Sequence, residues 1–318
     1  MPLRSIESYL DQIKANLRLD PYTEGKIIGE LKTYFDEKLG DLQADGLSRT
    51  EAERQAIRAF GQPRTVARLI YEAHSRGSWL EALLAAQPHL LGAVLFATHL
   101  WSHSFTLVVA FSLLLIVTLL GWAKGRPNWL YPWLGCAFAP ILAVVFLSRN
   151  FVYGSVLELI VGSGVAPEHV TLLLFLVLYG VAFWIVLAVV PRIVKRDWLL
   201  VSFMLAPLPV LGIWITAIDG VSEVLFSPGL IVHQWDRGMV IALLLLGVVA
   251  AAFTRLRQRV YKIGLLLIIG MGSTVVAGWS MLGARSFFGL LLLVGISLFT
   301  FLVPATLESV LGHGEAES

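Results

Sequence analysis

The chain has 318 residues, of which 57% are hydrophobic and only 14% are charged, and its formal net charge is +2. Soluble domains carry about a quarter charged residues, so this composition is typical of a polytopic membrane protein and excludes an ordinary soluble one. The small net charge and the single cysteine, Cys136, also exclude a strongly basic nucleic-acid-binding surface, an intrachain disulfide and a cysteine-based metal cluster.

Charge is concentrated at the start of the chain. Residues 1–79 contain 12 Lys and Arg and 12 Asp and Glu, and a mainly apolar sequence follows. The first twenty residues contain no uninterrupted apolar run of the kind found in a signal peptide, so we expect the N-terminus to remain in the cytoplasm. We therefore predict a cytoplasmic helical domain at 1–79, a transmembrane bundle at 80–307 and a polar cytoplasmic tail at 308–318.

The first half of the charged segment predicts two amphipathic helices. Ser5 is a candidate N-cap for the first helix. Asp20 and Pro21 provide a cap and a proline at the first position of the second helix, which Gly46 can close.

The second half predicts two further helices with clear boundaries. Ser48 and Glu51 form an S-x-x-E capping box at the start of the third helix. Gly61 is placed to end this helix, and Pro63 enforces the stop and begins the fourth.

Apolar residues at three- and four-residue spacing predict one small core shared by these four helices. Phe35 and Phe60 are its two phenylalanines, and we expect both to be core residues. The full predicted set is Ile6, Tyr9, Leu10, Ile13, Leu17, Ile28, Leu31, Phe35, Leu39, Leu42, Ala52, Ala56, Ala59, Phe60, Val66, Leu69 and Ile70.

Two stretches of this segment carry a resemblance to a known family. "ESYLDQIKANLRL" and "GELKTYFDEKLGDLQADGLSRTEAERQAIRAFGQPRTVARLIYEA" together resemble the bacterial HAAS or permease-prefix domain. The resemblance covers residues 4–76, and "GLSRTEAERQAIRAFGQPRTVA" is its most specific part. It implies a small cytoplasmic helical module ahead of transmembrane segments. Such modules are associated with signalling, sometimes beside PadR-type transcriptional regulators, or with ABC permease subunits.

The apolar part contains stretches of the roughly 20 residues that a transmembrane helix needs. The first is interrupted by Pro88 and His89, so one bent segment is an alternative to a first and second span joined by a tight turn. We predict about eight spans, at 83–101, 105–123, 129–147, 170–190, 198–218, 238–253, 263–281 and 287–307.

Lys and Arg between the spans predict the orientation. Nine lie in the loops on one side and three on the other, so we expect the nine, and both termini, on the cytoplasmic side of the inner membrane. The nine are Lys124, Arg126, Arg192, Lys195, Arg196, Arg255, Arg257, Arg259 and Lys262, and the three are Arg149, Arg237 and Arg285.

The two long outer loops, "SRNFVYGSVLELIVGSGVAPEH" and "DGVSEVLFSPGLIVHQWDRG", are apolar for loops, and each contains a short amphipathic run. We expect both to lie along the outer interface, with a re-entrant segment or a lid over a cavity as the alternative. Glu158 and Glu223 occupy matching positions in them. They are candidate residues for binding a cation or polar ligand, and the alternative is two solvated loop carboxylates.

Residues that carry catalysis or ion transport are scarce. Predicted spans two to eight contain no ionisable side chain, and His89 and His99 lie near the ends of the first, where packing or interfacial roles are expected. The Walker A, G-x-S-x-G and H-E-x-x-H motifs are missing. We therefore predict no catalytic, cofactor or metal site. A small-residue side formed by Gly270, Ser273, Thr274, Ala277 and Gly278 predicts close packing inside the bundle, or dimerisation.

These observations favour a non-enzymatic integral membrane protein in which a HAAS-like domain passes information to a cytoplasmic partner, such as a PadR-type regulator. The alternative is a permease or export component for an apolar or lipid-like solute, with an ABC ATPase subunit as its partner. In both cases the lipid bilayer is the surrounding solvent and direct nucleic-acid binding is not expected.

Overall fold

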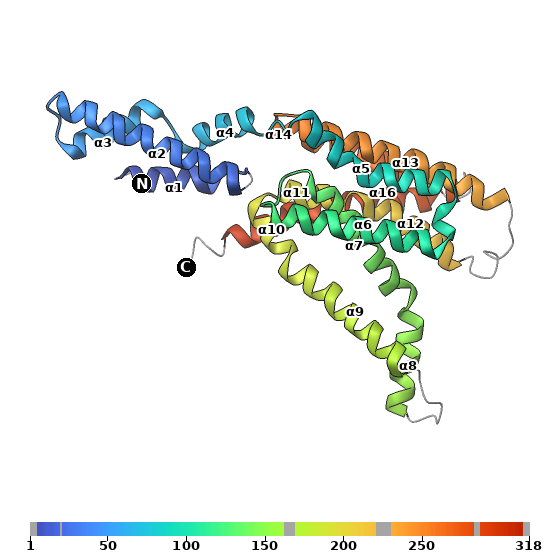
Figure 1. The fold of residues 1–318 in the computed structure, drawn as a ribbon. Helices are drawn as coiled ribbons and strands as arrows, with labels where there is room; N and C mark the ends of the chain where they lie inside the picture. Colours follow the sequence, from blue (N-terminus) through green and yellow to red (C-terminus); the bar gives the residue numbers. More distant parts are fainter. Residues whose placement is uncertain (1–4, 20, 162–168, 221–229, 283–286, 314–318) are drawn as a thin grey trace.

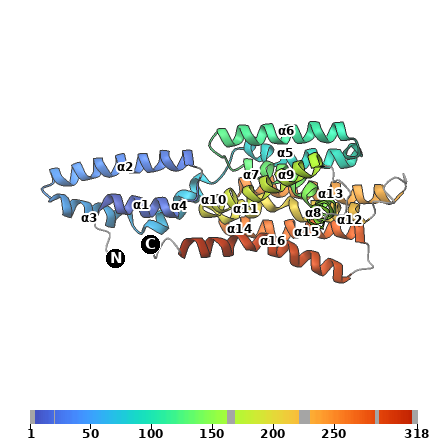
Figure 2. The ribbon, with the colours of Figure 1, turned by 90° about the horizontal axis from the view of Figure 1, so that it is seen from below.

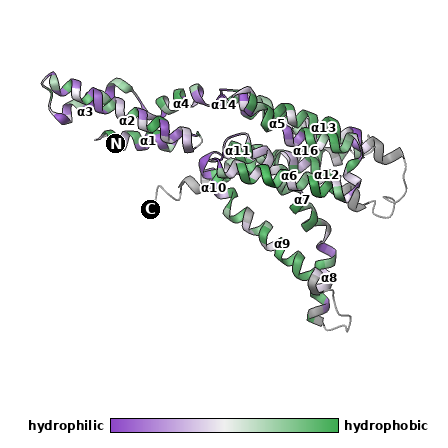
Figure 3. Ribbon diagram, viewed as in Figure 1, coloured by the Kyte–Doolittle hydropathy of each residue, from purple (hydrophilic) through white to green (hydrophobic). Residues whose placement is uncertain are grey.

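The computed structural model describes residues 5–19, 21–161, 169–220, 230–282 and 287–313 (Figure 1). The described residues are helical and include no strand, as the all-α prediction requires. Four mixed-polarity helices lie at one end of a predominantly apolar bundle (Figures 2 and 3). The four, called the front helices here, are α1 (Ile6–Asn16), α2 (Pro21–Ala44), α3 (Arg49–Phe60) and α4 (Pro63–His74).

The described caps of α1 and α2 lie where the sequence places them, whereas Asp20, the predicted cap of α2, lies outside the described residues. The Ser5 hydroxyl accepts a hydrogen bond from the Ser8 amide at 3.2 Å. At the end of α2, Gly46 has φ 92°, and the Leu47 amide bonds the Leu42 carbonyl at 3.2 Å, as in a Schellman motif.

The capping box of α3 is complete. Ser48 Oγ accepts from the Glu51 amide, and the Glu51 carboxylate accepts from the Ser48 amide at 3.2 Å. The hydrogen bonds from the Ser48 side chain and backbone hold the pKa of Glu51 below its usual value. Gly61 follows the helix with φ 98°, a conformation that a residue with a Cβ rarely adopts.

The core of the front helices centres on aromatic rings. Tyr9 and Phe35 are fully buried, and Phe60 is half-buried beside them with its ring centroid 5.0 Å from that of Phe35. The Tyr9 hydroxyl donates to the Gly61 carbonyl at 3.0 Å. The turn between α3 and α4 is therefore tied directly to α1.

Two predicted core positions are wrong. Leu69 is 56% exposed, because the buried side of α4 passes through Ala67, and Leu69 is rotated by about 200° from it at 100° per residue. Ala59 is exposed for a similar reason, since Ile57 lies on the buried side of α3 instead.

Within the described residues, the bundle contains seven helical segments that are long and apolar enough to cross a membrane, and an eighth if one bent pair is counted. This is the architecture of a multi-pass helical membrane protein. Its elements are α5 (Trp79–Ala97), η1 (Leu100–Ser102), α6 (Ser104–Ala123), α7 (Leu130–Leu147), α8 (Arg149–Val161), α9 (His169–Ala188), α10 (Val190–Arg196), α11 (Trp198–Leu205), α12 (Pro207–Gly220), α13 (Leu230–Arg255), α14 (Arg259–Leu265), the π-helix η2 (Leu266–Gly270), α15 (Met271–Leu282) and α16 (Phe287–His313).

Pro88 does not break the first membrane helix. Proline at this position leaves the carbonyl of Leu84 without its usual helical donor, and the Trp133 indole Nε1 of α7 donates to that carbonyl at 2.7 Å. The helix α5 therefore runs unbroken, beginning and ending about four residues earlier than predicted. The alternative of one bent first segment is wrong, because η1 and a turn at His99 (φ 56°) separate α5 from α6.

The first outer loop is largely helical. Its residues 149–161 form α8, which bends by 43° from α7 and, with α9, projects away from the bundle (Figure 1). Tyr153 and Ile160, seven residues apart, are exposed on one side of α8, and Val152 is buried on another, so apolar side chains occur on more than one side of this helix.

Three other predicted non-membrane segments are helical. The segment at 191–197 is mostly α10, which Pro191 starts from its first turn. Residues 230–237, assigned to the second outer loop, begin α13, and α16 continues to His313 through most of the predicted tail. Residues 305–311 contain no Pro or Gly that would end α16 at the predicted boundary, so this helix continues into the predicted tail.

Close helix contacts depend on small side chains. A Cβ at Gly135 of α7 would lie 1.9 Å from the Met204 carbonyl oxygen of α11, and one at Gly270 would lie 2.8 Å from the Phe301 ring of α16. Ser273, Thr274 and Ala277 are fully buried. The small-residue side of the seventh predicted span therefore packs within the chain.

Labelling at two exposed positions tests the orientation. Lys124 follows α6 at the end of the bundle that faces the front helices, and Tyr153 lies on α8, beyond the opposite end of α7. We expect a Lys124→Cys variant to react with a membrane-impermeant thiol reagent only after cells are opened, and a Tyr153→Cys variant to react in intact cells. The native Cys136 is buried and serves as the unreactive background. Reaction of Lys124→Cys in intact cells would contradict this orientation and indicate the opposite one.

Candidate functional site

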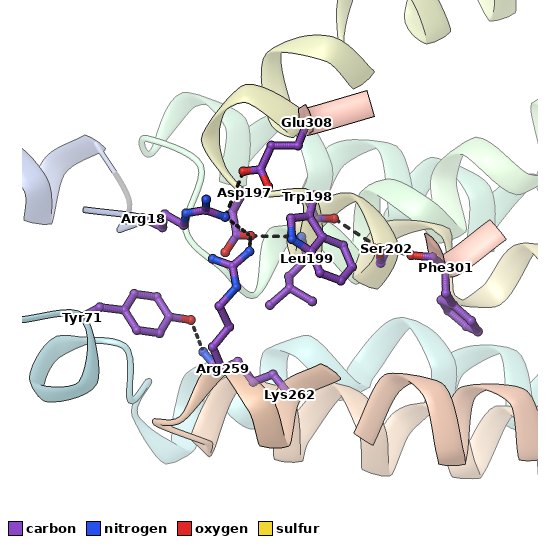
Figure 4. A network of polar contacts seen from close by, with 10 residues as sticks. All are labelled: Arg18, Tyr71, Asp197, Trp198, Leu199, Ser202, Arg259, Lys262, Phe301 and Glu308. Atoms are coloured by element: carbon purple, nitrogen blue, oxygen red, sulfur yellow. Dashed lines mark hydrogen bonds and ion pairs between the residues drawn. The ribbon is translucent and has the colours of Figure 1, made fainter. Parts of the chain in front are cut away.

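A network of charged side chains joins the front helices to the membrane bundle (Figure 4). Its central residue is Asp197, which lies between α10 and α11 and is only 3% exposed. Asp197 Oδ1 accepts from the Leu199 amide at 3.0 Å, so the carboxylate is the N-cap of α11. The same oxygen lies 2.8 Å from Nη2 of Arg259, at the start of α14. One buried carboxylate thus connects the ends of two bundle segments.

Arg18 extends the network to the front helices. It follows α1, and its Nη1 lies 3.7 Å from Asp197 Oδ1 and 2.9 Å from Oε1 of Glu308 on α16. Both carboxylates come from the bundle, and the guanidinium bridges them from outside it. Because the Arg18 side chain is only one-third exposed, this pairing is better shielded from solvent than a typical surface salt bridge.

Arg196 makes a second connection beside the first. Its Nε donates to the Leu19 carbonyl at 3.0 Å, and its Nη1 donates to the Tyr131 hydroxyl at 2.9 Å and to the Arg126 carbonyl at 3.2 Å. Leu19 belongs to the segment between α1 and α2, whereas Arg126 and Tyr131 flank the start of α7. A single guanidinium therefore positions three separate parts of the chain.

A third connection is made by α4. Nζ of Lys262, which is 2% exposed, donates to the Tyr71 hydroxyl at 3.0 Å. Burial, and secondarily the negative charge of Asp197, raise the pKa of Tyr71 above its usual value, so the phenol stays neutral. The ammonium also lies 5.1 Å from the ring centroids of Tyr71 and Phe253, within range of a cation–π interaction.

The link between α4 and α5 is fixed to the end of α13. The Gly77 amide donates to the Thr254 carbonyl at 2.8 Å, and Arg255 Nη1 donates to the Gly77 carbonyl at 2.7 Å. The Ser75 hydroxyl donates to the Arg257 carbonyl at 3.1 Å. Ser78 and Glu81 then form a capping box that starts α5. The chain therefore enters its first membrane helix along a defined path.

This site couples the front helices to the bundle electrostatically. Arg18 and Tyr71 of the front part contact charged side chains at or near the ends of α11, α14 and α16. A shift of any one of these bundle elements therefore moves charges that contact the front helices. Removing one partner from a buried ion pair is costly, typically several kcal/mol, because the remaining charge is left without compensation.

The site residues predicted from the sequence lie elsewhere. Glu158 is half-buried on α8, whereas Glu223 lies outside the described residues, so their pairing stays a prediction. Phe35, Ser48, Glu51, Phe60, Gly61 and Pro63 occupy the core, caps and turns of the front helices described above. Across the part of the chain that the structure describes, no group of three or more His, Cys, Asp or Glu is placed to hold a metal ion.

The apolar helices extend beyond predicted spans two to eight, which lack charged side chains. Buried Asp236 and Lys262 therefore fall near the ends of the observed segments Trp235–Arg255 and Arg259–Met281. The network residues were missed by the sequence analysis. Only Asp197 carries a local signal, as an acidic residue between "VKR" and the apolar run "WLLVSFML", which is the pattern of an N-cap.

The chain was compared with known families, curated proteins and solved structures, and no family, protein or structure matches it.

Proposed function

We propose that this chain is a non-enzymatic membrane regulator in which α1–α4 form a HAAS-like cytoplasmic domain that transmits the state of the bundle to a soluble protein partner. The observation that carries the proposal is the network around Asp197, in which Arg18 connects the front helices to α11, α14 and α16. Such a connection is needed if a change in the membrane part is to be sensed outside it.

Two further features support a role in protein binding. The front segment 1–79 carries equal numbers of positive and negative residues, which suits a protein partner better than an anionic bilayer or DNA. Its core is separate from those of the bundle, and exposed side chains such as Tyr22 and Leu69 remain on its surface. In the family that this segment resembles, such modules sometimes occur beside PadR-type transcriptional regulators, and a regulator of this type is the proposed partner.

The proposal is tested by capture of a partner on the full-length chain in membranes. We expect a cytoplasmic protein to co-purify with the wild type and to be lost when residues 1–77 are deleted. The Arg18→Gln variant should still capture the cytoplasmic protein, but the amount captured should no longer depend on the conformation of the bundle. Lys38→Gln, a change at a remote residue of α2, is the matched control. Equal capture by the wild type and the deletion variant would contradict the proposal.

A permease component for an apolar solute is the second candidate, and one observation favours it. An apolar cavity of about 690 Å³ lies within the bundle. This function requires an ATPase partner, because the chain carries no Walker A motif. Co-purification of an ATPase, together with ATP-dependent release of an apolar probe from reconstituted vesicles, would favour this function over the regulator.

A further inference from the structure

The cavity lies in the half of the bundle remote from the front helices. It is bounded by the last part of α5, η1, the first part of α6, the last part of α7, Leu178 of α9, and by α12 and α13. Small residues, among them Gly92, Ala110, Ala139 and Ala143, line it and leave the space that larger side chains would fill. Among the described residues, no charged side chain lines it.

Three aromatic residues form one wall of this cavity. The rings of Phe96, Trp101 and Trp214 lie with centroids 5.0–6.0 Å apart. Trp101 Nε1 donates to Asp236 Oδ1 at 2.8 Å, and the other oxygen of that carboxylate lies 2.6 Å from His99 Nδ1. Asp236 is 6% exposed and does not line the cavity. The polar atom of Trp101 is therefore engaged with Asp236, and the ring contributes apolar surface to the cavity.

The cavity opens toward the outside of the bundle. Three of its lining residues on α6 and α7 are substantially exposed: Leu107 by 43%, Val108 by 63% and Val144 by 40%. Other lining residues, such as Ala139 and Leu243, are almost fully buried. In a membrane-spanning bundle this open side faces the hydrocarbon of the bilayer.

The lining determines which molecule fits. A charged or strongly polar group would lose its hydration without gaining a partner, and water needs two to four polar partners to remain in a cavity. The volume falls within the range of roughly 300 to 1,000 Å³ that is usual for ligand sites. A flexible hydrocarbon chain that enters from the side needs no polar partner and fits a cavity of this volume.

We propose that this cavity is a binding site for the acyl chain of a membrane lipid, which enters between α6 and α7 and ends against the Phe96–Trp101–Trp214 wall. The headgroup stays outside, in the bilayer, because no charged residue lines the cavity to receive it. This inference does not depend on the proposed function, because its test measures binding and not signalling.

The test uses the full-length protein in vesicles that contain a phospholipid with a photoreactive diazirine in its acyl chain. After illumination, we expect crosslinks at buried lining positions such as Cys136 and Ala139, in addition to outward-facing positions on α9 such as Leu173. In Ala143→Phe, which fills the cavity, crosslinks at the buried positions should be lost and those on α9 retained. Ala110→Phe is a second filling variant, in case the first fails to fold.

Leu119→Phe is the matched control, because Leu119 is 64% exposed on α6 and does not line the cavity. Its crosslinking pattern should equal that of the wild type. Absence of crosslinks at the buried positions in the wild type, or their persistence in both filling variants, would overturn the proposal. Labelling of these positions by a diazirine-bearing alkane but not by the phospholipid would also overturn it, and would assign the cavity to a free apolar solute.

Discussion

Replacement of Asp197 by alanine is expected to loosen the attachment of the front helices to the bundle and to lower the free energy of unfolding by roughly 3 to 5 kcal/mol. The change leaves Arg259 without its partner at 2.8 Å and removes one of the two carboxylates beside Arg18. It also removes the N-cap of α11, a loss typically worth about 1 kcal/mol.

Hydrogen exchange of the full-length protein measures this effect. Amides of residues 17–19 and 71–77 should exchange faster in Asp197→Ala, together with the first turn of α11. Asp197→Asn separates the two contributions, because asparagine is also a good N-cap but carries no charge. In Asp197→Asn, the amides of the first turn of α11 should exchange as slowly as in the wild type, whereas those of residues 17–19 and 71–77 should still exchange faster. Glu37→Gln, at an exposed position of α2, is the control for loss of a carboxylate. Unchanged exchange in both Asp197 variants would show that the network does not hold the two parts together.

Phe35→Ala is expected to unfold the front helices while the bundle remains folded. Phe35 is fully buried, with its ring centroid 5.6 Å from that of Tyr9 and 5.0 Å from that of Phe60. Truncation of a buried phenylalanine costs roughly 3 to 5 kcal/mol. A domain of this size is only marginally stable, so the loss is comparable to its entire stability.

Limited proteolysis of the protein in membranes distinguishes the two parts. Residues 1–77 should be cleaved rapidly in Phe35→Ala, whereas the segment from α5 onward should resist. Leu69→Ala truncates an apolar side chain of the same part that is 56% exposed. Its cleavage rate should stay near that of the wild type, since exposed substitutions typically change stability by no more than about 0.5 kcal/mol. Equal protection of Phe35→Ala and the wild type would show that this core does not determine the folding of the front helices.

Local features of the sequence predict much of the fold. Capping residues act within one helical turn, so Ser48, Glu51 and Gly61 indicate helix ends without knowledge of the tertiary structure. Apolar spans are similarly local. Their boundaries were less predictable, because a proline such as Pro88 is tolerated only where another helix supplies a donor, here the Trp133 indole.

The Asp197 network could not be predicted in this way. Arg196 and Leu19 are 177 residues apart in the sequence, and Lys262 and Tyr71 are 191 apart. No periodicity or spacing relates residues at such distances. Their charges read as ordinary membrane-flanking residues until the folded helices bring them together. The apolar cavity could not be predicted from the sequence either, because its lining residues come from six α-helices and η1.

The Asp197 network holds the front helices on the bundle. Spin labels at Tyr22→Cys on α2 and Val248→Cys on α13 test it, since both positions are exposed and neither belongs to the network. Pulsed electron paramagnetic resonance should give one narrow distance distribution in the wild-type background and a broad one when Asp197→Ala is added. A broad distribution in the wild-type background, or a narrow one that Asp197→Ala leaves unchanged, would contradict the account.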